Sequence, residues 1–322
     1  MMGTLVKPTV RFFSVSALVA AVAVATSPAI AADGGVAVSS DGAGLEASFA
    51  EVGTSSAPFR GSGKRSLEAL IAEGADVSIE TATEFRRLVE ASVPSPLLAP
   101  EVILGRDTRE RTYTNYYPAR AKVLVTGRFG TGSYRCSGVL INKDTVVTAG
   151  HCVHGTNPQV WATSVVVYPG RNGTSIPYGS CTAKRLYSVV GWTTSKNEEY
   201  DYGAIKLNCT VGNTVGWYGY TTAGTTNYPS IVQGYPGDKP LEQWFSADKV
   251  WTVTTRQLFY RNDTIGGMSG SPVWYDLGTS GPYLIGIHAY GTHGVAPHNT
   301  YNHGTRITSE VFNNLTNWKN AL

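Results

Sequence analysis

The sequence predicts an all-β protein, an antiparallel barrel or sandwich, with one helix at its C-terminus. The first indication is composition, because 36 glycines and 18 tyrosines among 322 residues favour strands and turns over helices. The second is the chain from residue 102 onward, where short β-type runs alternate with glycine-rich turns. The third is the terminal stretch SEVFNNLTNWKNAL, in which Val311, Leu315, Trp318 and Leu322 recur at helical spacing.

The N-terminal residues 1–32 have the features of an export signal. Lys7 and Arg11 precede the apolar run FFSVSALVAAVAVA, and SPAIAAD then offers small residues at Ala29 and Ala31 for signal peptidase. The apolar run is too short to cross a membrane, and no other segment is long and apolar enough. We therefore expect a secreted, extracellular protein with no membrane partner.

Residues 33–101 differ in composition from the rest of the chain. A glycine- and serine-rich stretch leads into the acidic, helix-like SLEALIAEGADVSIETATEFRRLVEAS and then into PSPLLAP. One interpretation is a disordered linker. The export signal favours the other, a pro-segment, with the functional domain over residues 102–322.

The strands that we expect in residues 102–322 are short runs rich in valine, isoleucine and tyrosine. They are AKVLVTGRF, CSGVLIN, TVVTAG, SVVVYPG, YGAIKL, SIVQGYPG, KVWTVTT, SPVWY and YLIGIHAY. The glycines of GRFGTG, residues 127–132, resemble a dinucleotide-binding loop only superficially. No helix pattern follows them, so we interpret this stretch as a hairpin turn.

Charge and cysteine content narrow the functional class. Residues 1–101 carry 7 basic and 11 acidic side chains, and residues 102–322 carry 19 and 12, which gives net charges of −4 and +7. No lysine or arginine run and no RNA-binding signature accompanies this excess, so we expect no nucleic-acid partner. Four cysteines in an exported chain predict two disulfides, for which three pairings exist.

Three fragments carry groups that together perform nucleophilic catalysis. CSGVLINKDTVVTAGHCVH contains His151, EEYDYGAIKL contains Asp201, and DTIGGMSGSPVW contains Ser269. A serine hydroxyl needs an imidazole to take its proton, a carboxylate to orient that imidazole, and backbone N–H groups to hold the oxyanion. The chain order His, Asp, Ser on an all-β pattern is that of chymotrypsin-type proteases.

Within GGMSGSP we assign the nucleophile to Ser269. The N–H groups of Gly267 and Ser269 can point at one oxygen, because glycine tolerates the backbone conformation that this needs. Ser271 has a serine in place of that glycine, so we expect it to make a structural hydrogen bond. His154 lacks a comparable setting and is expected at the surface.

The cysteine positions favour one of the three pairings. Cys136 and Cys152 bracket the strand pair that leads to His151, so a disulfide between them would fix its position. Cys181 and Cys209 then remain, and their bond would close a loop that contains Asp201.

These motifs resemble the trypsin-like serine proteases and, more closely, the bacterial glutamyl endopeptidases of the bacillary type. TAGHC, DYGAI and GGMSGSP carry the resemblance, together with PGRNGTSIPYGS, GNTVGWYGY, GYPGDK and YNHGTRITSEVFNNLTNWKN, so that it covers nearly all of residues 102–322. It implies a chymotrypsin-like fold of two antiparallel six-stranded β-barrels and a secreted serine endopeptidase acting on proteins and peptides. We expect a monomer, and the mechanism needs no cofactor. We assign no metal site, because no loop spells out a ligand set, although a bound calcium ion stays an alternative.

The residues of the specificity pocket allow two interpretations. In trypsin-like enzymes an aspartate six residues before the nucleophile, here Asp263, binds arginine or lysine. The resemblance to the glutamyl endopeptidases implies instead that His288 and Thr264 receive a glutamate carboxylate, which imidazole and hydroxyl can both hydrogen-bond. This chain lacks the disulfide that braces the trypsin pocket, which favours the second interpretation. Met268 departs from the polar residue usual in the family and is expected near the pocket rim.

The junction LLAPEVILG provides an independent indication of glutamate specificity. Glu101 directly precedes Val102, so a cut between them would be glutamate-specific and would free the α-amine of Val102. In the resembling family this amine helps to bind the substrate carboxylate. We therefore expect self-processing at Glu101–Val102. A rival from another class is an inactive, protease-like binding module.

Overall fold

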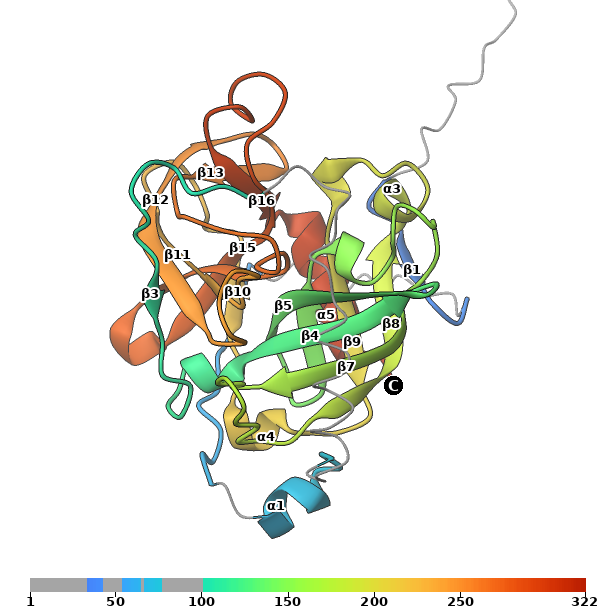
Figure 1. Cartoon of the computed structure of the whole chain (residues 1–322). Coiled ribbons are helices and arrows are strands. Elements are labelled where there is room, and N and C mark those ends of the chain that lie inside the picture. The colour runs from blue at the N-terminus through green and yellow to red at the C-terminus, as the bar shows by residue number, and fades with distance from the viewer. Residues whose placement is uncertain (1–33, 43–53, 65–66, 77–100) are drawn as a thin grey trace, which may run out of the picture. The chain divides into compact units, whose positions relative to one another are not determined.

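Two closed antiparallel β-barrels of six strands each form the body of the protein, as expected (Figure 1). The computed structural model describes residues 34–42, 54–64, 67–76 and 101–322. The first barrel comprises β4 (Lys122–Phe129), β5 (Gly132–Leu140), β6 (Thr145–Thr148), β7 (Thr163–Pro169), β8 (Cys181–Val189) and β9 (Gly203–Leu207). The second comprises β11 (Pro229–Gly234), β12 (Trp244–Val253), β13 (Gln257–Tyr260), β14 (Pro272–Asp276), β15 (Pro282–Tyr290) and β16 (Asn302–Arg306).

The first barrel closes because β8 pairs with both β7 and β9 at the two ends of the strand order β8-β7-β4-β5-β6-β9. β4 and β5 form a hairpin with Phe129 opposite Gly132, so GRFGTG is a turn, as predicted. Apolar side chains of these strands fill the barrel interior, among them Val123, Val125 and Ile205, each at 0% exposure. The expected strand runs in residues 121–207 are all strands, and the sequence analysis missed β8.

The second barrel has the strand order β14-β11-β12-β13-β16-β15 and closes through pairing of β14 with β15. β10 (Gly219–Thr221) lies parallel to β15, and β3 (Glu110–Arg111) pairs with β12. Both β13 and β16 were missed by the sequence analysis. Between these strands lie short helical turns: α3 (Val190–Thr193), α4 (Gly212–Val215), η1 (Ala119–Ala121), η2 (Gly150–Cys152), η3 (Glu198–Tyr200) and η4 (Gly278–Ser280).

The C-terminal helix α5 (Ser309–Asn320) follows the second barrel and packs on the first. The side chain of Thr308 accepts a hydrogen bond from Val311 N and so caps the helix, which explains where it begins. The Trp318 ring stacks on Tyr187 at a centroid distance of 5.8 Å. Leu322, expected on the docked face, is 94% exposed because the helix ends at Asn320 before reaching it.

Short elements of the described N-terminal residues add to both sheets. β1 (Ala37–Ser39) pairs antiparallel with β8, and β2 (Ser55–Ser56) pairs with β10. The helix α1 (Leu67–Ala72) packs Leu70 into the core of the first barrel. The predicted signal peptide and most of the helix-like acidic stretch lie outside the described residues. Within the described part, no helix is long and apolar enough to span a membrane.

Candidate active site

His151 and Asp201 meet in the first barrel. His151 lies in η2, directly after β6, and Asp201 follows η3 at the start of the turn into β9. Asp201, at 0% exposure, accepts hydrogen bonds from His151 N at 2.8 Å through Oδ1 and pairs with His151 Nδ1 at 2.7 Å through Oδ2. The residue before the histidine must be glycine, because a Cβ on Gly150 would lie 2.9 Å from Asp201 Oδ1. This arrangement directs the other imidazole nitrogen, Nε2, away from the carboxylate.

The two disulfides lie where the cysteine positions indicated. Cys136 in β5 is bonded to Cys152 in η2, the residue after His151, and Cys181 in β8 is bonded to Cys209 after β9. The first bond ties the histidine turn to the strand behind it. The second closes a loop of the chain that includes Asp201.

Ser269 lies in the bend before β14 of the second barrel. Its hydroxyl donates a hydrogen bond to Glu101 Oε1 at 2.6 Å, and its carbonyl oxygen accepts from Ser137 N of β5 at 2.8 Å. The second contact joins the serine bend to the first barrel, which also carries His151. The structure therefore brings all three predicted triad residues to one region where the barrels meet, with the serine hydroxyl engaged by the glutamate of the predicted processing junction.

The backbone at Gly267 has the shape expected for an oxyanion site. Gly267 has φ of 102°, which glycine adopts readily and other residues rarely do, and its carbonyl oxygen accepts a hydrogen bond from Ser137 Oγ at 2.9 Å. Within the described residues, the N–H groups of Gly267 and Ser269 have no hydrogen-bond acceptor, whereas those of Met268 and Gly270 do. Two unpartnered N–H groups beside a serine hydroxyl can stabilise a developing oxyanion.

Two of the predicted pocket residues, Thr264 and His288, each have a buried polar atom that makes no hydrogen bond among the described residues. Thr264 and His288 are both at 0% exposure, and neither Thr264 Oγ1 nor His288 Nε2 makes a hydrogen bond. The Glu101 carboxylate lies beside His288, with Oε1 3.6 Å from His288 Nε2. On the other side of the ring, His288 Nδ1 is 2.7 Å from the hydroxyl of Tyr260, which the sequence analysis did not identify. Burial raises the pKa of Tyr260 well above its usual value, so the phenol keeps its proton.

Asp263 is buried and fully engaged by the chain that follows the predicted cleavage site. One carboxylate oxygen accepts from Leu104 N at 2.7 Å, and the other accepts from Thr108 N at 2.8 Å and from Thr108 Oγ1 at 2.7 Å. Its exposed fraction is 1%. These contacts make Asp263 an anchor for residues 104–108.

Val102 lies next to the pocket. Its carbonyl oxygen accepts hydrogen bonds from Asn302 Nδ2 at 2.7 Å and from Thr264 N at 3.4 Å. Asn302, in the unpredicted strand β16, also donates to Asn262 O at 2.9 Å. No sequence pattern pointed to Asn302, because β16 (NHGTR) carries no hydrophobic run.

Three expectations about neighbouring residues were wrong. His154, expected at the surface, is 6% exposed because Trp161 and Trp192 pack around it, and its Nδ1 lies 2.9 Å from Lys196 Nζ. Ser271 was expected to make a structural hydrogen bond, but among the described residues only its backbone does so, and its buried hydroxyl has no partner. Met268, expected at the pocket rim, is at 0% exposure in the apolar core of the second barrel.

A group of possible metal ligands lies outside these residues. Glu198, His298 and His303 place one ligand atom each within 4.8 Å of one another, and the ring of His293 lies beside them. Burial, with His298 and His293 nearby, lowers the pKa of His303 to about 2, so its ring is neutral. No metal was expected here, although the regular spacing of His293, His298 and His303 is visible in the sequence.

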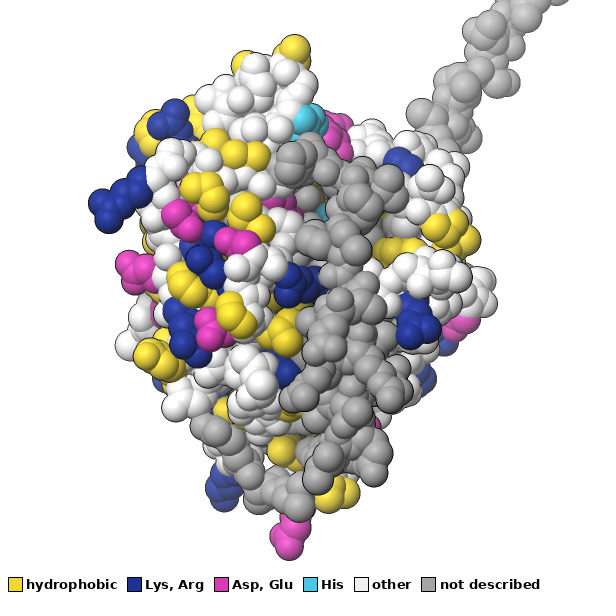
Figure 2. Space-filling model, viewed as in Figure 1, with side chains coloured by type: hydrophobic (Ala, Val, Ile, Leu, Met, Phe, Trp, Pro, Cys, Tyr) yellow, Lys and Arg dark blue, Asp and Glu magenta, His cyan; other side chains and the backbone are white. Residues whose placement is uncertain are grey.

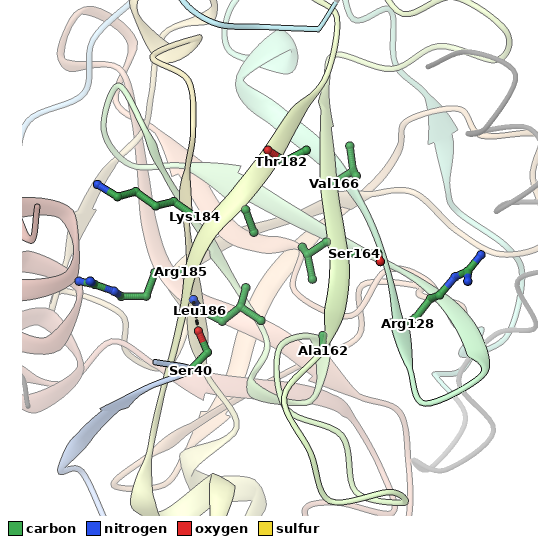
Figure 3. A pocket seen from close by; sticks show the side chains of 11 residues that line it. Ser40, Arg128, Ala162, Ser164, Val166, Thr182, Lys184, Arg185 and Leu186 are labelled. Carbon is green, nitrogen blue, oxygen red and sulfur yellow. Dashed lines mark hydrogen bonds between the residues drawn. The ribbon is translucent and has the colours of Figure 1, made fainter. Parts of the chain in front are cut away.

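Other surface features carry no comparable chemistry. A hollow of about 510 Å³ lies at β7 and β8 and is lined by residues of both strands, among them Ser164, Thr182 and Leu186 (Figure 3). It includes none of the predicted site residues. On the face shown in Figure 2, basic and acidic side chains are interspersed, in keeping with ion pairs such as Arg109–Asp238 and Arg111–Glu242.

Known proteins are similar to this chain over most of its length. Residues 107–316 match the family described as Trypsin. Glutamyl endopeptidase of Bacillus licheniformis is 43% identical over 243 residues, which are 72% of this chain and 74% of the relative. A Bacillus subtilis (strain 168) protein named extracellular metalloprotease is 40% identical over 272 residues, 82% of this chain and 80% of the relative. The solved structure of a Glu endopeptidase in complex with MPD has a TM-score of 0.59 at 28% identity, covering 68% of this chain and 100% of that one.

Proposed function

The chain belongs to the trypsin family of serine proteases and is a serine endopeptidase, and from this premise we propose that it is a secreted enzyme that cleaves peptide bonds after glutamate. The family and the fold do not distinguish one side-chain preference from another, because the pocket residues decide it. The glutamyl endopeptidase of Bacillus licheniformis, at 43% identity, supports glutamate.

The pocket itself is the observation that carries this proposal. Among the described residues, Thr264 Oγ1 and His288 Nε2 are buried polar atoms without a hydrogen bond, and the carboxylate 3.6 Å from His288 Nε2 belongs to a glutamate. Buried donors left without acceptors are unfavourable, so a site with two of them favours a ligand that accepts hydrogen bonds. Tyr260 remains protonated and can donate to His288 Nδ1, which leaves Nε2 as the ring nitrogen that can donate toward the carboxylate.

Asp263 argues against the arginine or lysine alternative. Three hydrogen bonds from Leu104 and Thr108 already occupy both of its oxygens, at 2.7 to 2.8 Å. The cation of a substrate arginine or lysine would have to displace these hydrogen bonds before it could pair with the Asp263 carboxylate.

The catalytic step follows from the arrangement of the triad. Ser269 attacks the peptide carbonyl carbon while His151 Nε2 takes the hydroxyl proton, and the imidazolium then gives that proton to the leaving amine. Asp201 keeps the Nδ1–H tautomer and stabilises the imidazolium through the 2.7 Å contact. The N–H groups of Gly267 and Ser269 hold the oxyanion, and water hydrolyses the acyl-enzyme in a second, equivalent step.

Maturation at Glu101–Val102 is the second part of the proposal. In the uncut chain the Glu101 side chain holds the Ser269 hydroxyl, so the nucleophile is engaged before processing. After the cut, the Val102 carbonyl can stay on Asn302 and Thr264, which keeps the new α-amine beside the pocket. A positive amine there adds to the two neutral donors in binding a glutamate carboxylate.

A cleavage-site map of a mixed peptide library, read by mass spectrometry, tests the specificity. We expect the mature protein to cut after glutamate. The same map compares cutting after glutamate with cutting after aspartate, the other acidic side chain. Cuts after arginine and lysine would place the specificity on Asp263 and exclude the proposed pocket.

A phosphonate probe that reacts with activated serine tests the mechanism. We expect one adduct on Ser269 of the mature protein, loss of peptide hydrolysis in proportion to labelling, and no adduct in Ser269→Ala. An inactive binding module would not be labelled. Hydrolysis by a metal-activated water, as the name of the Bacillus subtilis relative indicates for that protein, would continue after Ser269 is blocked.

A further inference from the structure

Four side chains from the two barrels meet beside the turn that carries Asp201. Glu198 begins η3 of the first barrel, His293 and His298 lie in the loop between β15 and β16, and His303 lies in β16 of the second barrel. His293 Nε2 is 3.1 Å from Glu198 Oε2, and His298 Nε2 is 3.2 Å from Glu198 Oε1. The ring centroid of His303 lies 4.8 Å from that of His298 and 5.1 Å from that of His293.

Two histidines of this cluster have ring nitrogens that make no hydrogen bond among the described residues. His303 is at 0% exposure, and within the described residues neither its Nδ1 nor its Nε2 has a hydrogen-bond partner. His293 Nε2 is also a buried atom without a hydrogen bond, even though Glu198 Oε2 is 3.1 Å away. Buried ring nitrogens normally find a partner, so the cluster lacks a group that would accept their lone pairs.

The separations fit ligands around one small cation. Ligand atoms at 2.0–2.1 Å from a tetrahedral zinc ion lie about 3.3 Å from each other. The two contacts of Glu198, at 3.1 and 3.2 Å, are close to that value, and the ligand atoms of Glu198, His298 and His303 all lie within 4.8 Å. The amide oxygen of Gln257 lies 3.0 Å from His298 Nε2 and adds a further oxygen at the same place.

We propose that Glu198, His298 and His303, with His293 as the fourth ligand, bind a zinc-class divalent cation that joins the two barrels. Imidazole nitrogen with one carboxylate suits zinc and its neighbours in the transition series, whereas calcium and magnesium prefer shells of oxygen. Partial exposure of the Glu198, His293 and His298 side chains, at 31, 30 and 23%, provides an entry path. With His293 added to Glu198, His298 and His303, protein side chains fill a tetrahedral shell, so we assign the ion a structural role.

The position of the cluster gives the ion a second effect, on the catalytic aspartate. Asp201 N donates to Glu198 O at 3.3 Å, and Asp201 O accepts from Thr305 Oγ1 of β16 at 3.1 Å, two residues beyond His303. Tyr290 stacks on His303 at 5.3 Å and lies 6.2 Å from the His151 ring. An ion between Glu198 and His303 would therefore fix the turn of Asp201 against the second barrel, which makes these ligands positioning residues.

Direct metal titration of the full chain carrying Ser269→Ala tests the site without any need for activity. Chelator-treated protein is titrated with Zn²⁺ by calorimetry and with Co²⁺ by visible absorption. We expect one ion per chain, an intense Co²⁺ spectrum typical of tetrahedral sites, and a higher melting temperature with Zn²⁺. Glu198→Gln and His298→Gln, both at partly exposed side chains, should weaken Zn²⁺ binding by about 100-fold. Mutations of residues that hold the ligands of a metal site lower its metal affinity by up to about this factor.

His154→Gln is the matched control, because it removes a histidine outside the cluster. It should bind Zn²⁺ as tightly as the parent. The site is excluded if the parent binds no stoichiometric Zn²⁺, or if Glu198→Gln and His154→Gln bind equally. Since Ser269→Ala is inactive by design, these results are independent of the proposed substrate.

The positioning effect is tested on active, mature protein. Removal of the ion should lower kcat by about 10-fold or more with little change in KM, and Zn²⁺ should restore it, whereas Glu198→Gln should not respond. A kcat that is the same with and without bound Zn²⁺ would overturn the positioning role.

Discussion

At the scale of single residues, the tautomer of His288 depends on one hydroxyl. Tyr260 is fully buried against Nδ1 at 2.7 Å, and the opposite nitrogen faces the pocket. A donor that bonds one nitrogen of an imidazole favours the tautomer with its proton on the other nitrogen. Tyr260 therefore sets the tautomer of His288 without itself contacting the substrate. The Asp263 carboxylate likewise depends on single contacts, because the three hydrogen bonds that it accepts all come from residues 104–108.

Tyr260→Phe should therefore weaken recognition of glutamate while leaving the triad intact. Without the hydroxyl, the buried His288 Nδ1 has no hydrogen-bond donor. The free energy of binding a glutamyl substrate should then be less favourable by about 1–3 kcal/mol. We expect KM for glutamyl substrates to rise about 10-fold or more, with kcat changed much less. Steady-state kinetics on a glutamyl peptide measure both parameters. Tyr113→Phe, at a 65% exposed tyrosine, is the control, and an equal response of the two variants would contradict the assignment.

His154 should make the stability of the protein depend on pH. Burial, and then the neighbouring Lys196, lower the pKa of His154 to about 4 from an ordinary value of 6.5. The unfolded chain therefore binds a proton at higher pH than the folded protein does. Stability is complete above about pH 6.5 and is lost as the pH falls toward 4, by about 2–3 kcal/mol.

Urea unfolding in the Ser269→Ala background measures this effect. The loss of unfolding free energy between pH 7.5 and pH 4.5 should be smaller by that amount in His154→Gln. An identical pH dependence with and without the histidine would show that His154 does not titrate as described.

At the scale of elements, strands were predictable where their side chains repeat in an apolar pattern. β4, β7 and β15 carry such runs and lie where they were expected. β16 (NHGTR) is a buried strand, but its buried side chains Asn302, His303 and Thr305 are polar. It therefore has no apolar pattern from which a strand could be predicted. β8 (CTAKRLYSV) places polar side chains outward along half its length and was hidden for that reason. Tertiary pairing rather than local preference makes these two segments strands.

The helix α5 should contribute strongly to stability because it closes the apolar core between the barrels. Leu315 is at 0% exposure in a cluster with Trp192 and Ile307. Leu315→Ala should lower the unfolding free energy by about 3 kcal/mol, from lost burial and a residual cavity. Thermal unfolding in the Ser269→Ala background should then shift down by roughly 6–12 °C. Asn320→Ala, at the exposed end of the helix, should shift it by much less, and equal shifts would mean that α5 does not close the core.

At the scale of the whole molecule, the described segments that precede residue 101 contact the sheets of the body. β1 and β2 extend the two sheets, and Glu101 reaches the Ser269 hydroxyl. The Glu101 carboxylate thus lies between the Ser269 hydroxyl and the His288 ring in the uncut chain.

Glu101→Gln should hinder maturation, because the amide removes the negative charge that the proposed pocket recognises. The expected result is accumulation of the full-length form, with at least about 10-fold slower release of the Val102 N-terminus, read by intact mass and N-terminal sequencing. Added mature wild-type protein should not rescue the variant but should cut Ser269→Ala at Glu101. Normal processing of Glu101→Gln would disprove a glutamate-specific cut.

The sequence by itself determined what depends on local pattern. Apolar runs and glycine-rich turns located most strands, and the motifs around His151, Asp201 and Ser269 identified the residues that the fold then brought together. Only the tertiary structure decided the use of Asp263, the partner of His288, the burial of His154 and the cluster of Glu198 with three histidines. Each of these is a contact between residues far apart in the chain. No periodicity encodes such contacts, because they exist only after two barrels have closed and packed against each other.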